Sequence, residues 1–343
     1  MASAHHPPLQ LGDPDRPGFG DCTGCHVCAL PCPVFHQTRD LSLTLHGRAR
    51  ALLAGATPGE VAASTLACVV CGACDPVCPE DIDTVGMTTD LRRRLTDNDD
   101  NPLATTLRKQ FPQWLEASPG SGHPPTAGKK FALLCSPRLN AQVGLLDAIV
   151  EVLGGSGQVT RLVDAGDDLA ARNEAGLEIS ATRRRDFLAS LPSASTVIAL
   201  DGLLLQVLRR WQPGRKTRSL GEALLRRPEV VQALQADDML IIDSRGFHAE
   251  HTRLVKFYDR IRAEQGCDTN LDLQRVAIPT GAVSLQARMG IGEHDVAAQV
   301  RWILEGRKPQ RLVVEAVEDL AAFRLHTELP VCHLAEVARG AGR

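Results

Sequence analysis

The chain of 343 residues is long enough for about two domains. Its 43% hydrophobic and 23% charged residues are typical of folded globular proteins, and they exclude a chain that is disordered, collagen-like or coiled-coil throughout. The net charge of −3 gives no overall basic field, so nucleic acid is not an expected partner. No stretch approaches the roughly 18 apolar residues of a membrane span, and residues 1–21 lack the apolar core of a signal peptide. We therefore expect a cytoplasmic protein with no transmembrane segment of its own.

Composition divides the chain into three parts. Residues 1–96 hold most of the cysteines, residues 97–130 are rich in proline, glycine and polar residues, and residues 131–343 are aliphatic. The middle part buries little apolar surface, so we expect a tether that contains a short helix around Leu103 to Leu115. The alternative is an ordered strap packed on a partner.

The cysteine-rich part is expected to be mostly helical. Leu45–Leu53 has the pattern of a helix, and a second helix is expected to run from Thr57 towards Cys68, because Thr57-Pro58-Gly59-Glu60 has the residues of a capping box. A third helix is expected over Thr84–Leu95, with Asp83 as its N-cap. Loops between these helices would bind metal.

The aliphatic part contains a weak internal repeat. Phe131–Ser136 and Met239–Ser244 are both short apolar runs typical of buried strands, and each is followed by an apolar helical stripe that a glycine ends. A second strand-then-helix unit begins at Thr196 and again at Leu312. The predicted fold is therefore a mostly helical, cysteine-rich domain plus an α/β domain built from two repeated strand–helix subdomains.

Eight cysteines form two copies of the pattern C-x2-C-x2-C-x3-C-P, which is typical of [4Fe–4S] proteins of the bacterial ferredoxin type. The copies are Cys22, Cys25, Cys28 and Cys32 before Pro33, and Cys68, Cys71, Cys74 and Cys78 before Pro79. Three cysteines spaced two apart wrap three corners of one cube, and the fourth cysteine of the motif ligates the other cluster. We therefore expect two [4Fe–4S] clusters with crossed ligands: Cys22, Cys25, Cys28 and Cys78 on the first, and Cys68, Cys71, Cys74 and Cys32 on the second.

A pair of structural zinc sites is the alternative, since four thiolates also suit tetrahedral zinc. Zinc ribbons typically use C-x2-C pairs, however, whereas the pattern here is three cysteines plus one with a following proline. Gly24 and Gly72 keep both loops slim, as a close approach of backbone to a cluster requires. Two adjacent clusters indicate electron relay.

The spacing of the two motifs, together with His46–Arg50 (HGRAR) and Cys71–Asp83 (CGACDPVCPEDID), resembles the α-helical ferredoxin domain. That domain occurs in the ferredoxin-type component of heterodisulfide reductase, in glycolate oxidase iron–sulfur subunits and in the corresponding component of anaerobic glycerol-3-phosphate dehydrogenase. The resemblance covers roughly the first 95 residues. It implies a flavin-containing dehydrogenase subunit as partner, and with it a membrane or quinone-linked subunit at the inner face of the membrane.

The remainder more faintly resembles the duplicated cysteine-rich domain with CCG triplets that follows this ferredoxin unit in the latter two families. Asp164-Ala165-Gly166 and Pro279-Thr280-Gly281 stand where the triplets would be, and the glycines remain without their cysteines. Residues 199–202 and 315–318, where later cysteines would fall, hold none. The resemblance implies that this chain kept the fold and lost the third metal centre.

A few further residues could take part in function. Cys135, Cys267 and Cys332 are expected to be small buried hydrophobic residues. His248 and His251 are either a metal pair or, as we expect, solvated side chains on a helix. His26 and His36 could tune a cluster potential by hydrogen bonding, although exposed loop histidines are favoured. The arginine runs at 92–94 and 183–185 are expected to be solvated helix faces, with a docking patch for an acidic partner as the alternative.

These patterns predict an iron–sulfur electron-transfer subunit of a multisubunit oxidoreductase, which relays electrons between a flavin dehydrogenase and quinone or another acceptor. Catalysis would then belong mainly to other chains, since no nucleophile with a base at motif spacing and no nucleotide-binding fingerprint is visible. One alternative is a heterodisulfide-reductase-like enzyme that reduces a thiol or disulfide substrate in its carboxy-terminal domain. Another is a scaffold in which the clusters only brace the fold.

Overall fold

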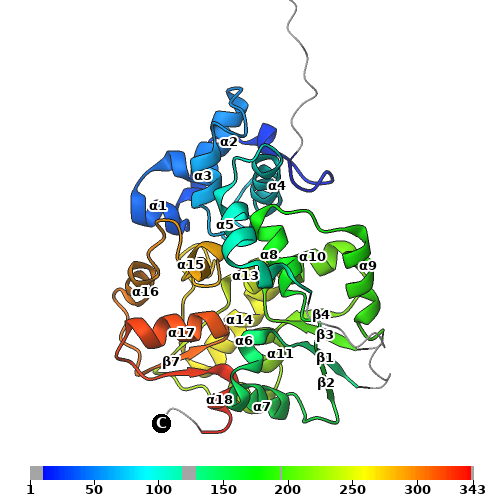
Figure 1. Ribbon diagram of the computed structural model, residues 1–343. Helices are drawn as coiled ribbons and strands as arrows, with labels where there is room; N and C mark the ends of the chain where they lie inside the picture. Colours follow the sequence, from blue (N-terminus) through cyan, green and yellow to red (C-terminus); the bar gives the residue numbers. More distant parts are fainter. Residues whose placement is uncertain (1–10, 118–128, 194, 341–343) are drawn as a thin grey trace, which may run out of the picture.

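The amino-terminal part of the chain consists of short helices with loops between them. The computed structural model describes residues 11–117, 129–193 and 195–340. The helical elements of this part are η1 (Phe19–Asp21), η2 (Val27–Ala29), α1 (Pro33–Thr38), η3 (Leu41–Leu43), α2 (Leu45–Leu53), α3 (Ala62–Ala67) and α4 (Thr84–Asp97). They gather at one end of the molecule, with the sheets at the other end (Figure 1).

Two of the three predicted helices begin where the sequence places them. Helix α2 has the expected bounds and is capped by Thr44, whose hydroxyl accepts a hydrogen bond from the N–H of Gly47. Helix α4 is capped by Asp83, as predicted, and runs two residues further than expected. The capping box at Thr57 forms through hydrogen bonds with Glu60, but the chain makes turns before regular helix begins at Ala62.

The carboxy-terminal part alternates strands and helices. Its first half contains β1 (Phe131–Leu134), α6 (Pro137–Asn140), α7 (Val143–Val152), β2 (Val159–Leu162), α8 (Asp167–Ala175), α9 (Ala181–Ser190), β3 (Thr196–Ala199), α10 (Gly202–Trp211), β4 (Thr217–Ser219), α11 (Leu220–Leu225) and α12 (Pro228–Gln232). Its second half contains β5 (Asp238–Ile241), α13 (Ser244–His248), α14 (His251–Gln265), β6 (Asp268–Thr269), α15 (Leu285–Met289), α16 (Val296–Leu304), β7 (Arg311–Val314), α17 (Val317–His326), β8 (Val331–His333) and α18 (Leu334–Val337).

The strands form two parallel sheets of equal size and equivalent order. The first sheet has the order β2-β1-β3-β4 and the second has the order β6-β5-β7-β8. Strands β1, β5 and β7 are buried along their whole length, as central strands covered by helices on both faces must be. The predicted α/β architecture with two strand–helix subdomains is therefore confirmed.

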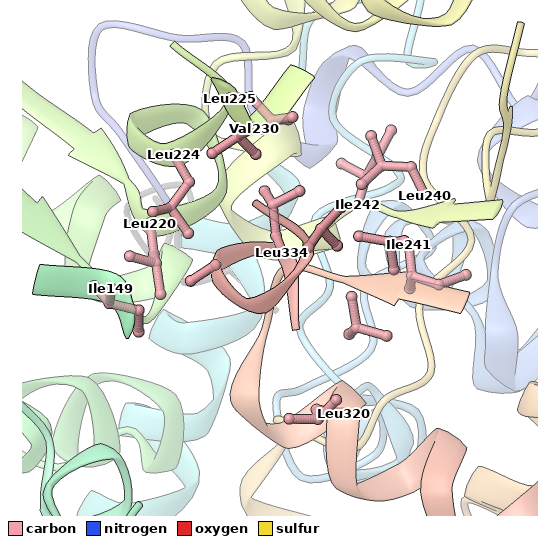
Figure 2. Close-up of a cluster of buried hydrophobic side chains, with 14 of the residues drawn as sticks. Ile149, Leu220, Leu224, Leu225, Val230, Leu240, Ile241, Ile242, Leu320 and Leu334 are labelled. Atoms are coloured by element: carbon pink, nitrogen blue, oxygen red, sulfur yellow. The ribbon is translucent and has the colours of Figure 1, made fainter. Parts of the chain in front are cut away.

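One large hydrophobic core joins the two sheets. Helix α18, at the end of the chain, packs against α7 and α11 of the first half. Figure 2 shows Leu334 of α18 between Leu220 and Leu224 of α11 on one side and Ile241 and Ile242 on the other. Because side chains from both halves fill this core, neither half buries its apolar surface alone.

The segment between the two parts is packed rather than free over its described residues. It forms α5 (Pro102–Gln110) and η4 (Pro112–Leu115). Leu103 and Leu107 of α5 are fully buried in a cluster with Leu177, which follows α8, and with Leu285 of α15. The residues of this segment up to 117 therefore pack against the α/β domain of the same chain rather than forming the free tether that we expected, while residues 118–128 lie outside the described residues. In the described ranges no helix is both long and apolar enough to cross a membrane.

Candidate iron–sulfur site

The two cysteine loops share a backbone conformation. In each loop the two residues beside the second cysteine have left-handed φ angles, Gly24 (79°) and His26 (67°) in the first loop and Val70 (51°) and Gly72 (77°) in the second. Left-handed residues next to right-handed ones curl the chain so that successive N–H groups face one concavity, a conformation common around iron–sulfur sites. Val70 adopts it although a β-branched side chain disfavours it, which marks the second loop as strained.

Four cysteines line a cavity that we call the distal cavity. The hydrogen bonds to the α/β domain, described below, come from the loop of the other cavity. These cysteines are Cys22, Cys25, Cys28 and Cys78. The fourth of them comes from the other motif. Cys25 is exposed and the other three are partly buried. The rings of His26 and His46 lie against each other beside this cavity, with centroids 3.9 Å apart and planes tilted by 31°.

The other four cysteines line a second cavity, which we call the proximal cavity. These cysteines are Cys32, Cys68, Cys71 and Cys74. Again the fourth comes from the other motif, since Cys32 is the N-cap residue of α1, where Pro33 turns the chain away. Cys32 and Cys71 are buried. The remaining wall is apolar except for the side chains of Thr44, Thr84, Thr88 and Arg48.

The two cavities are neighbours. Leu45 lines both of them, and the Sγ atom of Cys74 on the proximal side lies 3.9 Å from the carbonyl oxygen of Cys28 on the distal side. In the described residues no three Cys, His, Asp or Glu side chains converge as the ligands of a single ion would, and the thiols instead surround these two spaces.

The electrostatics of the thiols favour a positively charged group in each cavity. Burial raises the pKa of Cys28 to about 12, and repulsion from neighbouring thiolates, Cys32 first, adds to the effect. The pKa of Cys71 is raised to about 12 for the same reasons, with Cys68 as the main neighbour. Thiols this close become thiolates only when a cation balances their charge, so the donor sets fit iron–sulfur cores.

Cys68 differs from the other thiols of the proximal cavity. Burial acts to raise its pKa, but the positive charges of Arg48 and Arg92 and a hydrogen bond from the N–H of Val70 outweigh burial, so that the pKa lies below its ordinary value. The proximal cavity thus contains one thiol that its protein surroundings already favour as a thiolate.

The loop of the proximal cavity is the docking point of the α/β domain. Carbonyl oxygens in and just before this loop accept hydrogen bonds from side chains of two helices of the α/β domain and of α4 in the cysteine-rich part. Arg245 of α13 donates to Val69 (2.8 Å), Gln286 of α15 donates to Leu66 and Cys68 (both 2.8 Å), and Arg92 of α4 donates to Cys68. Arg245 also forms a two-pronged ion pair with Glu174 of α8 (2.7 and 3.0 Å). Helices α8, α10 and α13 lie between the cysteine-rich part and the sheets (Figure 1).

His248 is a further docking residue that the sequence did not reveal. We expected it on a solvated helix face, but it is buried. Its Nε2 accepts a hydrogen bond from the N–H of Ala277, so its Nδ1 carries the proton and donates it to the carbonyl oxygen of Cys71 at 2.8 Å. Burial lowers the pKa of this imidazole to about 4, so it is neutral at physiological pH. His251 instead contacts the carbonyl oxygen of Arg275.

The expectation of solvated helix faces is also wrong for two arginines. Arg92 is fully buried, and Arg183 is held between Asp164 and Asp168 at 2.6–2.8 Å. Neither side chain is free to dock an acidic partner. His36 stacks on Trp302 of α16 at 3.8 Å, which ties α1 to the α/β domain.

The resemblance places further cysteines at four positions, several of which hold polar side chains. Three of these positions lie at or just after the ends of β2, β3 and β7, and residues 279–281 lie in the loop between β6 and α15. Asp164 pairs with Arg183, Asp201 lies 3.6 Å from Arg245, and Glu315 accepts a hydrogen bond from Tyr258. The side chain of Thr280 contacts Asp319. The glycines at the triplet positions, Gly166 and Gly281, both have left-handed φ angles (71° and 77°) that disfavour other residues.

The three remaining cysteines are buried, as expected. Cys135, Cys267 and Cys332 are 1–4% exposed, and burial raises the pKa of each to about 11. At neutral pH they are therefore protonated.

Comparison with known protein families identifies the cysteine-rich part. Residues 18–82 match the family described as a 4Fe-4S dicluster domain. No curated protein and no solved structure matches the chain significantly. The match supports 4Fe-4S binding and an electron-transfer role for this part of the chain.

Proposed function

We propose that this protein relays electrons through two [4Fe–4S] clusters within a larger oxidoreductase. The single observation that carries the proposal is the crossing of the motifs, in which each cavity is lined by three cysteines of one loop and the fourth of the other. Cys22, Cys25, Cys28 and Cys78 would hold one cluster, and Cys32, Cys68, Cys71 and Cys74 the other. When bound, such clusters supply one-electron transfer at potentials that charge, hydrogen bonds and exposure set.

The rest of the chain supports a relay rather than an isolated enzyme. The distal cavity has an exposed ligand, Cys25, where a partner's redox group could approach, whereas the α/β domain covers the loop of the proximal cavity. The three carboxy-terminal thiols are buried and protonated, so they offer no surface for a disulfide substrate. The partner we propose, a flavin-containing dehydrogenase with a quinone-linked acceptor, is suggested by the resemblance of the cysteine-rich part. With such a partner the complex would lie in the cytoplasm, at the inner face of the membrane.

Anaerobic reconstitution of the full chain tests the proposal. We expect about eight irons and eight sulfides per chain, absorbance near 400 nm that dithionite bleaches, and electron paramagnetic resonance signals of two spin-coupled clusters. Cys78→Ser should change the spectroscopic signal of the cluster held by Cys22, Cys25 and Cys28. Cys32→Ser should change the signal of the cluster held by Cys68, Cys71 and Cys74. Cys135→Ser is the matched control and should keep the full iron content.

Other outcomes would contradict the proposal. Two equivalents of zinc with no visible absorbance would show structural metal sites instead. Turnover of disulfides by the chain without a partner would favour the reductase that we set aside, because a relay should be inert alone. Clusters that no physiological reductant reduces would leave only a structural role.

A further inference from the structure

The charge around the two cavities is unequal. Among the largest side chains that are completely buried are three arginines, Arg48, Arg92 and Arg245, each at most 2% exposed. All three contact the proximal cavity or its loop. Burying a guanidinium costs free energy unless a negative charge lies beside it, so we look for the negative group that balances each arginine. Arg245 has its own, since Glu174 binds both of its terminal nitrogens.

Arg48 has no carboxylate partner within the described residues. Its Nη1 donates to the carbonyl oxygen of Ser64 at 2.6 Å and contacts the hydroxyl of Ser64 at 3.3 Å, and its Nη2 donates to the hydroxyl of Thr88 at 2.9 Å. Its Nε is buried without a hydrogen-bond partner. The side chain lines the proximal cavity directly. Neutral oxygens therefore orient this cation, but no carboxylate of the described chain neutralises it.

Arg92 is in the same situation. Its three nitrogens donate to the carbonyl oxygens of Thr65, Glu174 and Cys68, and over the described ranges no carboxylate forms an ion pair with it. The contact with Cys68 places the guanidinium against a residue whose thiol lines the proximal cavity. Arg48 and Arg92 thus bring two positive charges without matching carboxylates to one side of the site.

The missing negative charge is what a cluster in the proximal cavity would supply. A cubane core with two positive charges held by four thiolates is formally a dianion, and two guanidiniums balance it. Among the described residues no arginine lines the distal cavity. Arg50 is exposed and donates to the carbonyl oxygen of Cys22 at 3.4 Å. Water screens that charge, and Glu80 lines the same cavity.

We propose that Arg48 and Arg92 are the built-in counter-ions of the proximal cluster and that they raise its reduction potential above that of the distal cluster. Reduction adds one negative charge. Burial alone would oppose that charge, but two unscreened cations in the same low-dielectric region favour it more strongly than burial disfavours it. An electron that enters beside the exposed Cys25 would therefore pass to the proximal side, leaving the distal cluster oxidised. The inference rests on the proposed two-cluster relay and adds its internal direction.

A redox titration of the reconstituted full chain, followed by electron paramagnetic resonance, tests this direction. We expect two one-electron midpoints. A water-soluble paramagnetic relaxation agent identifies the cluster near the exposed Cys25 without any mutation, and this cluster should be the one reduced at the more negative potential. Arg48→Met should move only the higher midpoint to more negative values, and Arg92→Met should do the same. Arg48→Lys, which keeps the charge, should restore most of the shift.

The matched control is Arg50→Met, in the same helix as Arg48 but exposed at the distal loop, and it should leave both midpoints unchanged. If Arg48→Met fails to hold clusters, Arg48→Lys and Arg92→Lys still test the charge, since each should keep the higher midpoint close to that of the parent protein. Equal midpoints, a relaxation agent that acts on the cluster reduced first, or an arginine variant that shifts the lower midpoint would each overturn the inference. A chain that binds no clusters would instead refute the proposed function itself.

Discussion

The ion pair between Arg245 and Glu174 gives the sharpest test of how the two parts of the chain are joined. Arg245 donates to both oxygens of Glu174 and also to the carbonyl oxygen of Val69 in the proximal loop, while the N–H of Leu285 donates to Glu174. Both charged side chains are 1–2% exposed. Arg245→Met would leave a buried carboxylate with one remaining hydrogen bond from Leu285, and Glu174→Gln would leave a buried guanidinium short of its counter-charge.

The burial of both charges sets the expected changes in unfolding free energy. Removing one partner of a buried ion pair costs about 3–5 kcal/mol of unfolding free energy, because the other charge stays buried. The double variant Arg245→Met/Glu174→Gln buries no uncompensated charge of this pair, and its glutamine oxygen can still accept from Leu285. Its losses are the donor to Val69 and the positive charge 3.6 Å from Asp201, so we expect it to cost clearly less than the sum of the two single substitutions. The two substitutions should therefore be strongly non-additive.

Urea unfolding of the reconstituted protein measures these differences with two signals. The three tryptophans, Trp114, Trp211 and Trp302, all lie outside the cysteine-rich part and report on the segment of residues 97–117 and on the α/β domain, while visible absorbance reports on the clusters. In Arg245→Met the clusters should be lost before the fluorescence changes. Arg185→Met, at an exposed pair with Asp186, is the control and should shift stability by less than about 0.5 kcal/mol. Additive costs in the double variant would refute the reasoning.

Two further predictions concern the buried carboxylates and the contact between the two parts. Burial, with the charges of Asp319 and Glu222, raises the pKa of Glu315 from 4.5 to about 7. The carboxyl of Glu315 therefore holds its proton more tightly in the folded state than in the unfolded state. The unfolding free energy should fall by about 3 kcal/mol as pH rises from about 4.5 to 7. Thermal unfolding of Glu315→Gln followed by tryptophan fluorescence should show a flatter pH dependence and a higher midpoint at pH 8; an unchanged profile would contradict this. A Cβ at Gly176 (φ 74°) would lie 2.4 Å from the backbone of Arg92 and Arg93, so Gly176→Ala should cost clearly more unfolding free energy than a control. The control is Gly290→Ala, at a helix-ending glycine with a positive φ and open space around it, which should cost only about 1–2 kcal/mol. Equal costs would mean that α4 and α8 are not in close contact.

Much of the fold follows from local patterns in the sequence. Helices α2 and α4 begin at Thr44 and Asp83 because these side chains satisfy N–H groups that the helix leaves free. Strands β1 and β5 are visible as apolar runs because both of their faces are covered. The edge strands cannot be recognised from the sequence in this way. β6 has only two residues and β4 only three, so neither carries enough periodicity to be recognised.

The cysteines of the site could be read from spacing, but their surroundings could not. A guanidinium at position 92 or an imidazole at position 248 is polar in the sequence, and polar residues on helices are mostly exposed. Here His248 contacts Cys71 from 177 residues away, and Arg245 contacts Val69 from 176 residues away. No local pattern encodes such pairings, although the unusual run of arginines around 92–94, next to the second motif, is a signal that could have been weighed as structural.

The polar residues that stand where the resemblance places cysteines in the α/β domain and the buried arginines at the proximal cavity are parts of one arrangement. Where the resemblance places metal ligands after the strands, Asp201 now lies beside Arg245, and Arg245 ties the proximal loop to Glu174. The same docking keeps water away from Arg92, whose contact with the carbonyl oxygen of Glu174 exists only while α8 is in place. An exposed arginine would be screened and would contribute little to a cluster potential. We therefore infer that the α/β domain acts on the relay by keeping Arg48 and Arg92 in low-dielectric surroundings, where their charges are effective. Any substitution that loosens this contact should lower the higher of the two reduction midpoints before it lowers the iron content.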